Sequence, residues 1–191
     1  LLPFVAQRLH KALPRLELML HEHQTGPMLE RLRAGDIDMG VLALPIDLDG
    51  LHAEPLYDEP FVVAMPAGHA LAARKQMRAE DLRGQTLLLL EEGHCLRDQA
   101  LEVCSRVPVS EKQDFRGTSL ETLRQMVAAD AGITLLPEFA TRGAYAHSKG
   151  VAIRPFARPV PVRRIGAVWR KSSPRAAALA AVSKVIAEHA L

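Results

Sequence analysis

The chain has 191 residues, of which 48% are hydrophobic and 24% charged, a composition typical of a globular protein with one large domain or two small ones. Only 4% are aromatic, and the net charge is +2 with basic residues scattered among acidic ones. These residues therefore lack the basic face and stacking side chains of nucleic-acid binders, and we expect that they do not bind DNA by themselves. Neither a membrane-span pattern nor a signal-peptide pattern is present, which favours a cytoplasmic protein.

Helical and strand patterns alternate almost throughout the chain. In chain order we predict a helix over residues 2–13, a strand over 16–22, a helix over 24–34, strands over 38–44 and 61–65, a short helix at 80–82, a strand over 86–90, a helix between the two cysteines, a strand at 115–117, a helix from 118 to near 132, strands over 133–136, 151–153 and 165–169, and a last helix from about 174. This alternation predicts an α/β fold with mainly parallel sheets.

One pattern, a helix followed by glycine and a short aliphatic strand, occurs twice. It covers residues 28–41 and residues 123–137, nearly a hundred residues apart. Two such units suggest two similar α/β lobes, although glycine-capped helix–strand units are common in any α/β protein.

The chain has two cysteines, Cys95 and Cys104, and the segment between them contains neither Gly nor Pro and is rich in helix formers. In a helix, nine residues rise about 13–14 Å and turn roughly two and a half times, so the two thiols would face opposite sides. A disulfide needs Cα atoms roughly 4.4–6.8 Å apart. A helical pair could join only by unwinding, which indicates a redox switch; the alternative is two small buried apolar residues.

Two motifs carry a resemblance to a known family. Leu32, Gly35, Ile37 and Asp38 match the pattern Leu-x-x-Gly-x-Leu/Ile-Asp, and residues 132–137 match Gly-Ile/Leu-x-Leu-Leu-Pro. Both resemble the effector-binding domain of LysR-type transcription regulators. The resemblance implies two Rossmann-like lobes of the periplasmic-binding-protein type: lobe I over 1–57 and 164–191, and lobe II over 58–163 with the cysteines. The winged helix-turn-helix pattern of such regulators is absent, so we expect a regulatory domain alone.

Within this family, the cysteine segment is similar to that of the peroxide-sensing members. The similarity covers Gly-His-Cys-Leu-Arg-Asp-Gln-Ala at 93–100 with Cys104, the residues 118–124, and the residues 21–25. It implies a transcription regulator of the oxidative stress response. Hydrogen peroxide would oxidise Cys95 to a sulfenic acid, and Cys104 would then resolve it to a reversible disulfide bond.

Several neighbours are candidates for a peroxide pocket around Cys95, which should lie near a helix N-terminus where a thiolate is favoured. His94 and Arg97 could add positive charge or hydrogen bonds. The remaining candidates are Thr25, Asp98, and Arg163 or Arg164. Each has an ordinary alternative role: Thr25 as a helix cap, Asp98 as an acid on the first helical turn, and the arginine as a solvated cation.

The resemblance also implies partners. We expect a homodimer or homotetramer that binds DNA through the N-terminal domain, contacts RNA polymerase as a full-length regulator, and is reduced by glutaredoxin or thioredoxin. No cofactor and no membrane are implied. A metal site from His94, Cys95 and Cys104 is disfavoured because these residues lack the close spacing of zinc ligands.

Two other functions stay open at this point. A LysR-type domain could bind a small organic anion between its lobes, at a helix that begins with Thr118 and Ser119. The capping-box spacing of residues 118–121 favours simple capping there instead. A thiol peroxidase enzyme is the third possibility, but we expect stoichiometric oxidation rather than catalysis.

Overall fold

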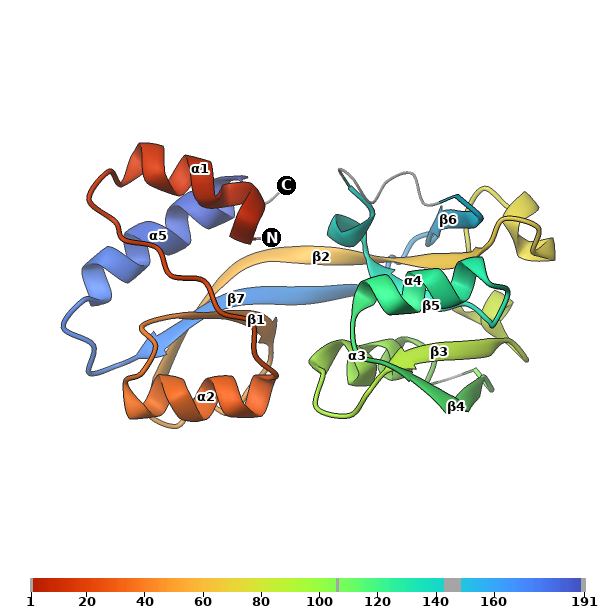
Figure 1. The fold of residues 1–191 in the computed structure, drawn as a ribbon, viewed down its shortest axis with the longest axis horizontal. Helices are drawn as coiled ribbons and strands as arrows, with labels where there is room; N and C mark the ends of the chain where they lie inside the picture. Colours follow the sequence, from red (N-terminus) through yellow and green to blue (C-terminus); the bar gives the residue numbers. More distant parts are fainter. Residues whose placement is uncertain (1, 106, 143–148, 190–191) are drawn as a thin grey trace. The chain divides into compact units, whose positions relative to one another are not determined.

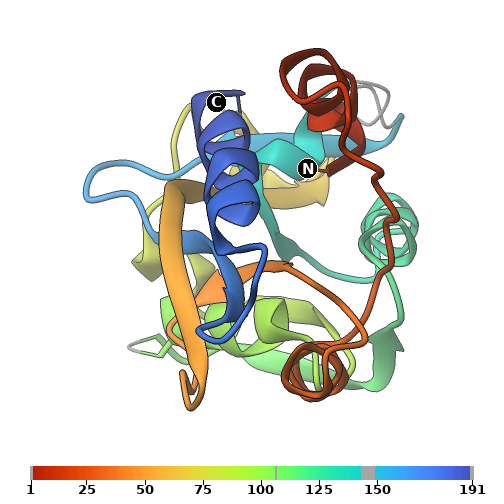
Figure 2. The ribbon, with the colours of Figure 1, turned by 90° about the vertical axis from the view of Figure 1, so that its left-hand side faces the viewer.

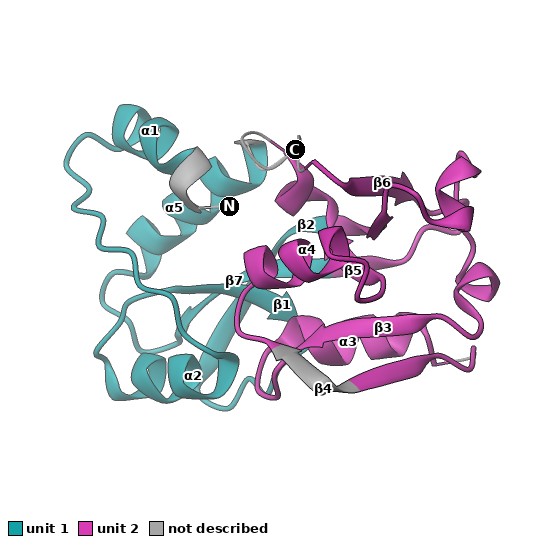
Figure 3. Ribbon diagram, turned by 45° about the vertical axis from the view of Figure 1, so that its right-hand side comes forward, with its two compact units in different colours: residues 1–58, 164–191 teal, residues 59–163 magenta. Residues whose placement is uncertain are grey.

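The structure, a computed structural model, describes residues 2–105, 107–142 and 149–189, and it divides the chain into two units. Unit 1 comprises residues 1–58 and 164–191, and unit 2 comprises residues 59–163 (Figures 1 and 3). The sequence analysis placed the first boundary after residue 57 rather than after 58. Both units combine helices with strands, so the α/β class is confirmed.

Unit 1 is built around an antiparallel pairing of β1 with β7, from Gly40↔Val168 to Leu44↔Arg164. Buried leucines of α2 pack on this sheet. On the other side of the unit, α1 and α5 lie side by side and bury apolar residues between them (Figure 2). The elements of unit 1 are α1 (Leu2–Ala12), α2 (Thr25–Ala34), β1 (Gly40–Leu44), the first part of β2 (Leu51–Pro66), most of β7 (Val162–Arg170) and α5 (Ala176–His189).

Unit 2 contains two sets of paired strands. The second half of β2 pairs antiparallel with β5 and β6, and β3 pairs parallel with β4. The elements of unit 2 are η1 (Ala70–Ala73), η2 (Ala79–Leu82), β3 (Thr86–Leu90), α3 (Cys95–Val103), β4 (Ser110–Gly117), α4 (Leu120–Ala128), β5 (Thr134–Pro137), η3 (Glu138–Thr141) and β6 (Val151–Pro155). One large apolar core, which includes the buried strand β3 and residues of β2, α3, α4 and β5, lies inside this unit.

Three sequence-based expectations are corrected by this architecture. Mainly parallel pairing is wrong, because β2 and β7 run antiparallel to the strands β5, β6 and β1. The predicted strand at 61–65 is only the second half of β2, which has 16 residues. The predicted strand at 16–22 is irregular backbone: no described residue pairs with it, and Leu18, Met19 and Leu20 are exposed.

The two helix–glycine–strand units use their glycines differently. Gly35 caps α2 in the left-handed conformation at φ 97° and donates its N–H to the carbonyl of Arg31. Gly132, at φ 153°, allows close approach of two chain segments: a Cβ there would lie 2.6 Å from the backbone oxygen of Thr86. At this contact the N–H of Ile133 donates to Thr86 at 2.9 Å, and the N–H of Leu88 donates to Ile133 at 2.8 Å.

The described part of the chain contains no candidate membrane-spanning helix. No helix there combines the length and the apolar character that a bilayer span requires.

Candidate functional site

Cys95 is the first residue of α3. This helix follows β3 in the chain (Figure 1). The strand is buried from residue 87 to residue 90, and a turn with Gly93 at φ 91° leads to the N-cap, His94. The His94 side chain does not cap the helix. Cys95 is half-buried at this helix N-terminus, where the N–H of Arg97 donates to the carbonyl of His94 at 2.9 Å. This position is the one expected for Cys95 from the sequence, and the role of Cys95 as the peroxide-reactive thiol stays a prediction.

Cys104 lies at the opposite end of the helix, as the C-cap of α3. It is 3% exposed and belongs to the apolar core of unit 2. Burial raises the pKa of the Cys104 thiol from 9.0 to about 11, because the charged form is desolvated. At neutral pH the thiol keeps its proton, and it is a poor nucleophile for as long as α3 stays folded.

The helix between the two cysteines is confirmed. Nine helical residues span Cys95–Val103, and both thiols are free. Nine steps of about 1.5 Å separate the two Cα atoms by roughly 13–14 Å along the axis, about twice the largest separation that a disulfide tolerates. Formation of a bond between the two sulfurs therefore requires α3 to unwind.

The inner face of α3 anchors it to the core. Leu96 is 7% exposed and Ala100 is 2% exposed, and both belong to the same cluster as Cys104. The same helix also buries a polar atom, which lowers its stability. Within the described residues, the side-chain oxygen Oε1 of Gln99 is buried without a hydrogen-bond partner. The helix is thus held by apolar contacts and weakened by one unsatisfied carbonyl.

Arg97 is bound to a carboxylate that the sequence analysis did not identify. Its Nη1 donates to Oε1 of Glu111 at 2.7 Å, and its Nη2 donates to Oε2 at 3.0 Å. A longer contact of 3.4 Å joins Nη1 to the carbonyl of Leu90. The hydrogen bonds to Glu111 raise the pKa of Arg97, against the opposing effect of burial. Its charge is therefore neutralised locally by Glu111.

His94 and Asp98 complete a group of charges on the first turn of α3. The imidazole Nε2 of His94 lies 3.8 Å from Oε1 of Glu91, and both side chains are partly exposed. The negative charge of Asp98 helps to raise the pKa of Arg97. His94, Arg97 and Asp98 thus share the first turn of α3 with Cys95, and their contact with the thiol stays a prediction.

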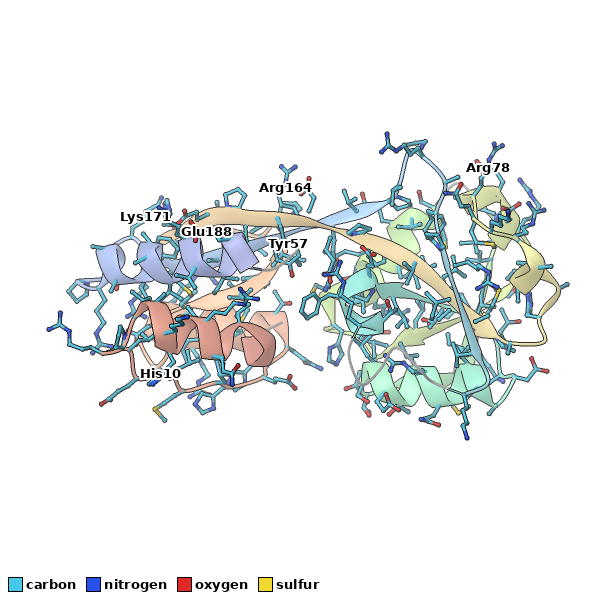
Figure 4. All side chains as sticks on the ribbon, turned by 90° about the horizontal axis from the view of Figure 1, so that it is seen from above. His10, Tyr57, Arg78, Arg164, Lys171 and Glu188 are labelled. Atoms are coloured by element: carbon cyan, nitrogen blue, oxygen red, sulfur yellow. The ribbon has the colours of Figure 1, made fainter. Side chains whose placement is uncertain are left out.

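The two arginines at the border between the units are both paired. Arg163 contacts the 3% exposed Glu59, with Nε and Nη2 at 2.7 and 2.6 Å from the same carboxylate oxygen. Arg164 donates to Asp58 at 2.8 Å and lowers the pKa of that carboxyl, and its side chain lies on the exposed surface (Figure 4). A contact of either arginine with the reactive thiol stays a prediction.

Thr25 and Ser119, the two hydroxyl candidates, occupy different positions relative to their helices. Thr25 is the first residue of α2, and Gln24 takes the N-cap position instead, so the alternative of Thr25 as the cap is wrong. Ser119 is the N-cap of α4, and its Oγ accepts the N–H of Thr122 at 3.1 Å. Capping at this helix N-terminus is therefore confirmed, but the predicted register of residues 118–121 is wrong by one residue, because Ser119 rather than Thr118 is the N-cap and the helix begins at Leu120.

Comparison with known proteins assigns the class. The family described as LysR substrate binding domain matches residues 1–191, and the chain belongs to this family. More particularly, it is 45% identical over 174 residues to the DNA-binding transcriptional dual regulator OxyR of Escherichia coli K12, which covers 91% of this chain and 57% of that protein. It is 42% identical over 189 residues to the hydrogen peroxide-inducible genes activator of Dickeya chrysanthemi, at 99% and 62% coverage. The chain thus spans about three fifths of the length of these relatives.

Solved structures agree with this assignment. The reduced form of the OxyR regulatory domain from Pseudomonas aeruginosa matches with a TM-score of 0.88 and 37% identity, over 100% of this chain and 90% of that one. An oxidised form of OxyR matches with a TM-score of 0.87 and 41% identity, over 98% and 88%. The fold class and the resemblance to peroxide-sensing LysR-type regulators are confirmed.

Proposed function

We propose that this chain is the peroxide-sensing regulatory domain of a transcription regulator and that it is switched by a reversible disulfide between Cys95 and Cys104. The observation that carries the proposal is the position of the two thiols at opposite ends of one helix. Cys95 is half-buried at the N-terminal end, whereas Cys104 is buried at the C-terminal end. The names of the relatives, hydrogen peroxide-inducible genes activators, support peroxide as the oxidant.

The first step is oxidation of Cys95. Its thiolate sulfur attacks one oxygen of hydrogen peroxide, and the O–O bond breaks. The leaving hydroxide takes up a proton and becomes water, and the sulfur is oxidised to a sulfenic acid. His94 lies next to Cys95 in the chain and is the candidate donor of positive charge or of a proton, since Arg97 is bound to Glu111. Thr25 and Arg163 stay candidates for contacts with the peroxide.

The second step is resolution by Cys104. With α3 folded, the Cys104 thiol is buried and its pKa is about 11. Unwinding of α3 removes the desolvation, so the thiol can ionise and can reach Cys95. The Cys104 sulfur then attacks the Cys95 sulfur, an S–S bond forms, and the hydroxyl of the sulfenic acid leaves as water. A dithiol reductant such as glutaredoxin or thioredoxin returns both cysteines to thiols.

The readout is the two-state segment from residue 95 to residue 104. A switch needs one local chemical change and one structural element that can adopt two arrangements. Here the disulfide is the chemical change, and the helical segment is the element with two arrangements. In the full-length regulator we expect a homodimer or homotetramer, in which the refolded segment changes the packing of subunits and thereby the DNA-binding domains and contacts with RNA polymerase. The setting is the reducing cytoplasm of a bacterium, and the oxidation is stoichiometric rather than enzymatic.

The test is a titration of the folded, reduced chain with stoichiometric hydrogen peroxide. Free thiols are counted by alkylation and mass spectrometry, and helix content is followed by far-UV circular dichroism. We expect the loss of both thiols, a mass decrease of about 2 Da for the disulfide, and a loss of helical signal. Retention of two free thiols in the folded wild-type chain, or a disulfide without loss of helix, would contradict the proposal.

A further inference from the structure

We propose that Glu111 is a positioning residue that sets the equilibrium between the dithiol and disulfide forms through its ion pair with Arg97. The inference rests on the proposed function, since it concerns the same two cysteines. It assigns a role to a carboxylate on β4 that lies outside the cysteine segment.

The contact between Arg97 and Glu111 has the geometry of a strong ion pair. Two parallel hydrogen bonds, of 2.7 and 3.0 Å, join the two guanidinium nitrogens to the two carboxylate oxygens. The side chains are only 11% and 26% exposed. Bidentate, charge-assisted hydrogen bonds of this kind are stronger and more specific in geometry than neutral ones, and partial burial reduces screening by solvent.

Neighbouring charges do not offer Arg97 an equivalent partner. Glu92 and Asp98 act on Arg97 through longer-range attraction, and the hydrogen bonds to Glu111 are the largest cause of its raised pKa. The contact between His94 and Glu91, which both precede α3 in the chain, is longer at 3.8 Å and more exposed. Exposed pairs of that kind contribute little to stability. Glu111 is therefore the main electrostatic anchor of the first turn of α3.

The ion pair between Arg97 and Glu111 connects two parts of the chain. One is the helical segment that must unwind, and the other is β4, which lies outside that segment. Arg97 is two residues after Cys95, inside the segment that leaves the helix when the two sulfurs approach each other. Glu111 is seven residues after Cys104, on β4, which pairs with β3. Because unwinding displaces the Arg97 backbone, the pair stabilises the dithiol form and is lost in the disulfide form. Glu111 thereby makes oxidation harder without touching either sulfur.

The experiment equilibrates the chain in mixtures of reduced and oxidised glutathione and measures the ratio of disulfide to dithiol by alkylation and mass spectrometry. In Glu111→Gln the side-chain size is kept and the charge is lost. We expect the ratio to rise by about tenfold or more relative to wild type, because one member of a partly buried ion pair is left uncompensated. In Arg97→Lys, which keeps the charge but loses the bidentate fork, we expect a smaller rise.

Two controls separate this role from a general loss of stability. The double variant Arg97→Glu with Glu111→Arg restores an ion pair with reversed polarity, and we expect its ratio to return toward the wild-type value. Arg74→Gln breaks another ion pair of unit 2, the 3.2 Å contact with Asp81, which does not involve α3. We expect it to leave the ratio unchanged.

The rate of the first oxidation step gives a further readout. In a Cys104→Ser background, sulfenic acid formation at Cys95 is trapped with a dimedone-type reagent. Glu111→Gln also frees the charge of Arg97, which is two residues after Cys95, so we expect some change in this rate. Since the role assigned to Glu111 is conformational, we expect that change to be much smaller than the change in the ratio of disulfide to dithiol. A change in rate as large as the change in the ratio would show that Glu111 acts on the thiolate itself and would overturn the assignment.

The outcomes distinguish this inference from the proposed function. If the wild-type chain forms the disulfide but Glu111→Gln has the wild-type ratio, or if Arg74→Gln shifts the ratio equally, the inference alone is overturned. If the wild-type chain keeps two free thiols under peroxide, the proposed function fails and this inference fails with it.

Discussion

The two ends of α3 place chemically identical side chains in opposite environments. At the N-terminal end Cys95 is half-buried, next to His94 in the chain and on the same helical turn as Arg97 and Asp98. At the C-terminal end Cys104 is enclosed by apolar residues, and burial raises its pKa to about 11. The comparison teaches that one helix can hold two thiols in different environments, because its N-terminal end is partly exposed whereas burial in the core disfavours ionisation at its C-terminal end.

The largest expected effect is on sulfenic acid formation, when one thiol is removed at a time and the two ends of α3 no longer carry the same side chain. Cys95→Ser should abolish sulfenic acid formation, since the remaining thiol is buried and protonated at neutral pH. Cys104→Ser should form the sulfenic acid at the wild-type rate and retain it. Both are measured with a dimedone-type probe and mass spectrometry. Labelling of Cys104 in the folded Cys95→Ser chain would reverse the assignment of roles.

The next effect concerns the anchor at the N-terminal end of the helix. Leu96→Ala removes a side chain that is only 7% exposed, and we expect it to lower the free energy of unfolding by about 2–4 kcal/mol. Chemical denaturation of the reduced chain measures this loss. Glu102→Ala, at an exposed position of the same helix, is the matched control. An equal loss in both variants would mean that Leu96 is not an anchor.

The pH dependence of the free energy of unfolding should contain a contribution from Cys104, at the C-terminal end of α3. The folded Cys104 thiol keeps its proton to about pH 11, whereas the unfolded thiol loses it near pH 9.0. The unfolded state therefore binds fewer protons between these values, and the free energy of unfolding falls as pH rises, by up to about 2–3 kcal/mol. Denaturation of the reduced chain between about pH 8 and pH 11 measures this fall.

The control for this pH dependence is Cys104→Ser, which lacks the titrating thiol but keeps all other ionisable groups. The difference between wild type and variant isolates Cys104 from the lysines and tyrosines that titrate in the same range. A difference that stays constant with pH would contradict the burial of the Cys104 thiol in the reduced form.

The smallest effect has the opposite sign. Gln99→Leu replaces a side chain whose oxygen is buried and unpaired within the described residues, and it should raise the free energy of unfolding by about 1–2 kcal/mol. It should also shift the glutathione equilibrium toward the dithiol form, because the helix becomes more stable. Thermal unfolding of the reduced chain measures the first effect. A lower melting temperature would show that the Gln99 amide is satisfied.

Local sequence patterns predicted what depends on nearby residues. The bounds of β3, the helix between the cysteines, and the closure of α2 by Gly35 follow from apolar runs, helix propensity and glycine conformation. The position of Cys95 at a helix N-terminus follows from the same information. These features are specified within a few residues, so no knowledge of distant contacts is needed.

Features that depend on distant residues were missed. Glu111 is 14 residues from Arg97, and the two meet only because β4 pairs with β3 while α3 packs beside it. Glu59 and Arg163 are 104 residues apart in the chain. The alternating apolar pattern of residues 16–22 is typical of a strand, but a strand also requires a neighbour that accepts its hydrogen bonds. Such partners cannot be identified from local patterns alone.

Gly132 has a consequence for Cys95, which lies far from it along the chain. The atom that would clash with a methyl group at position 132 is the backbone oxygen of Thr86, and no change of side-chain rotamer can relieve that clash. Any larger residue must therefore shift the first residue of β3, whose other end leads into the turn before Cys95. The position of the Cys95 thiol thus depends on a hydrogen atom where every other amino acid has a carbon.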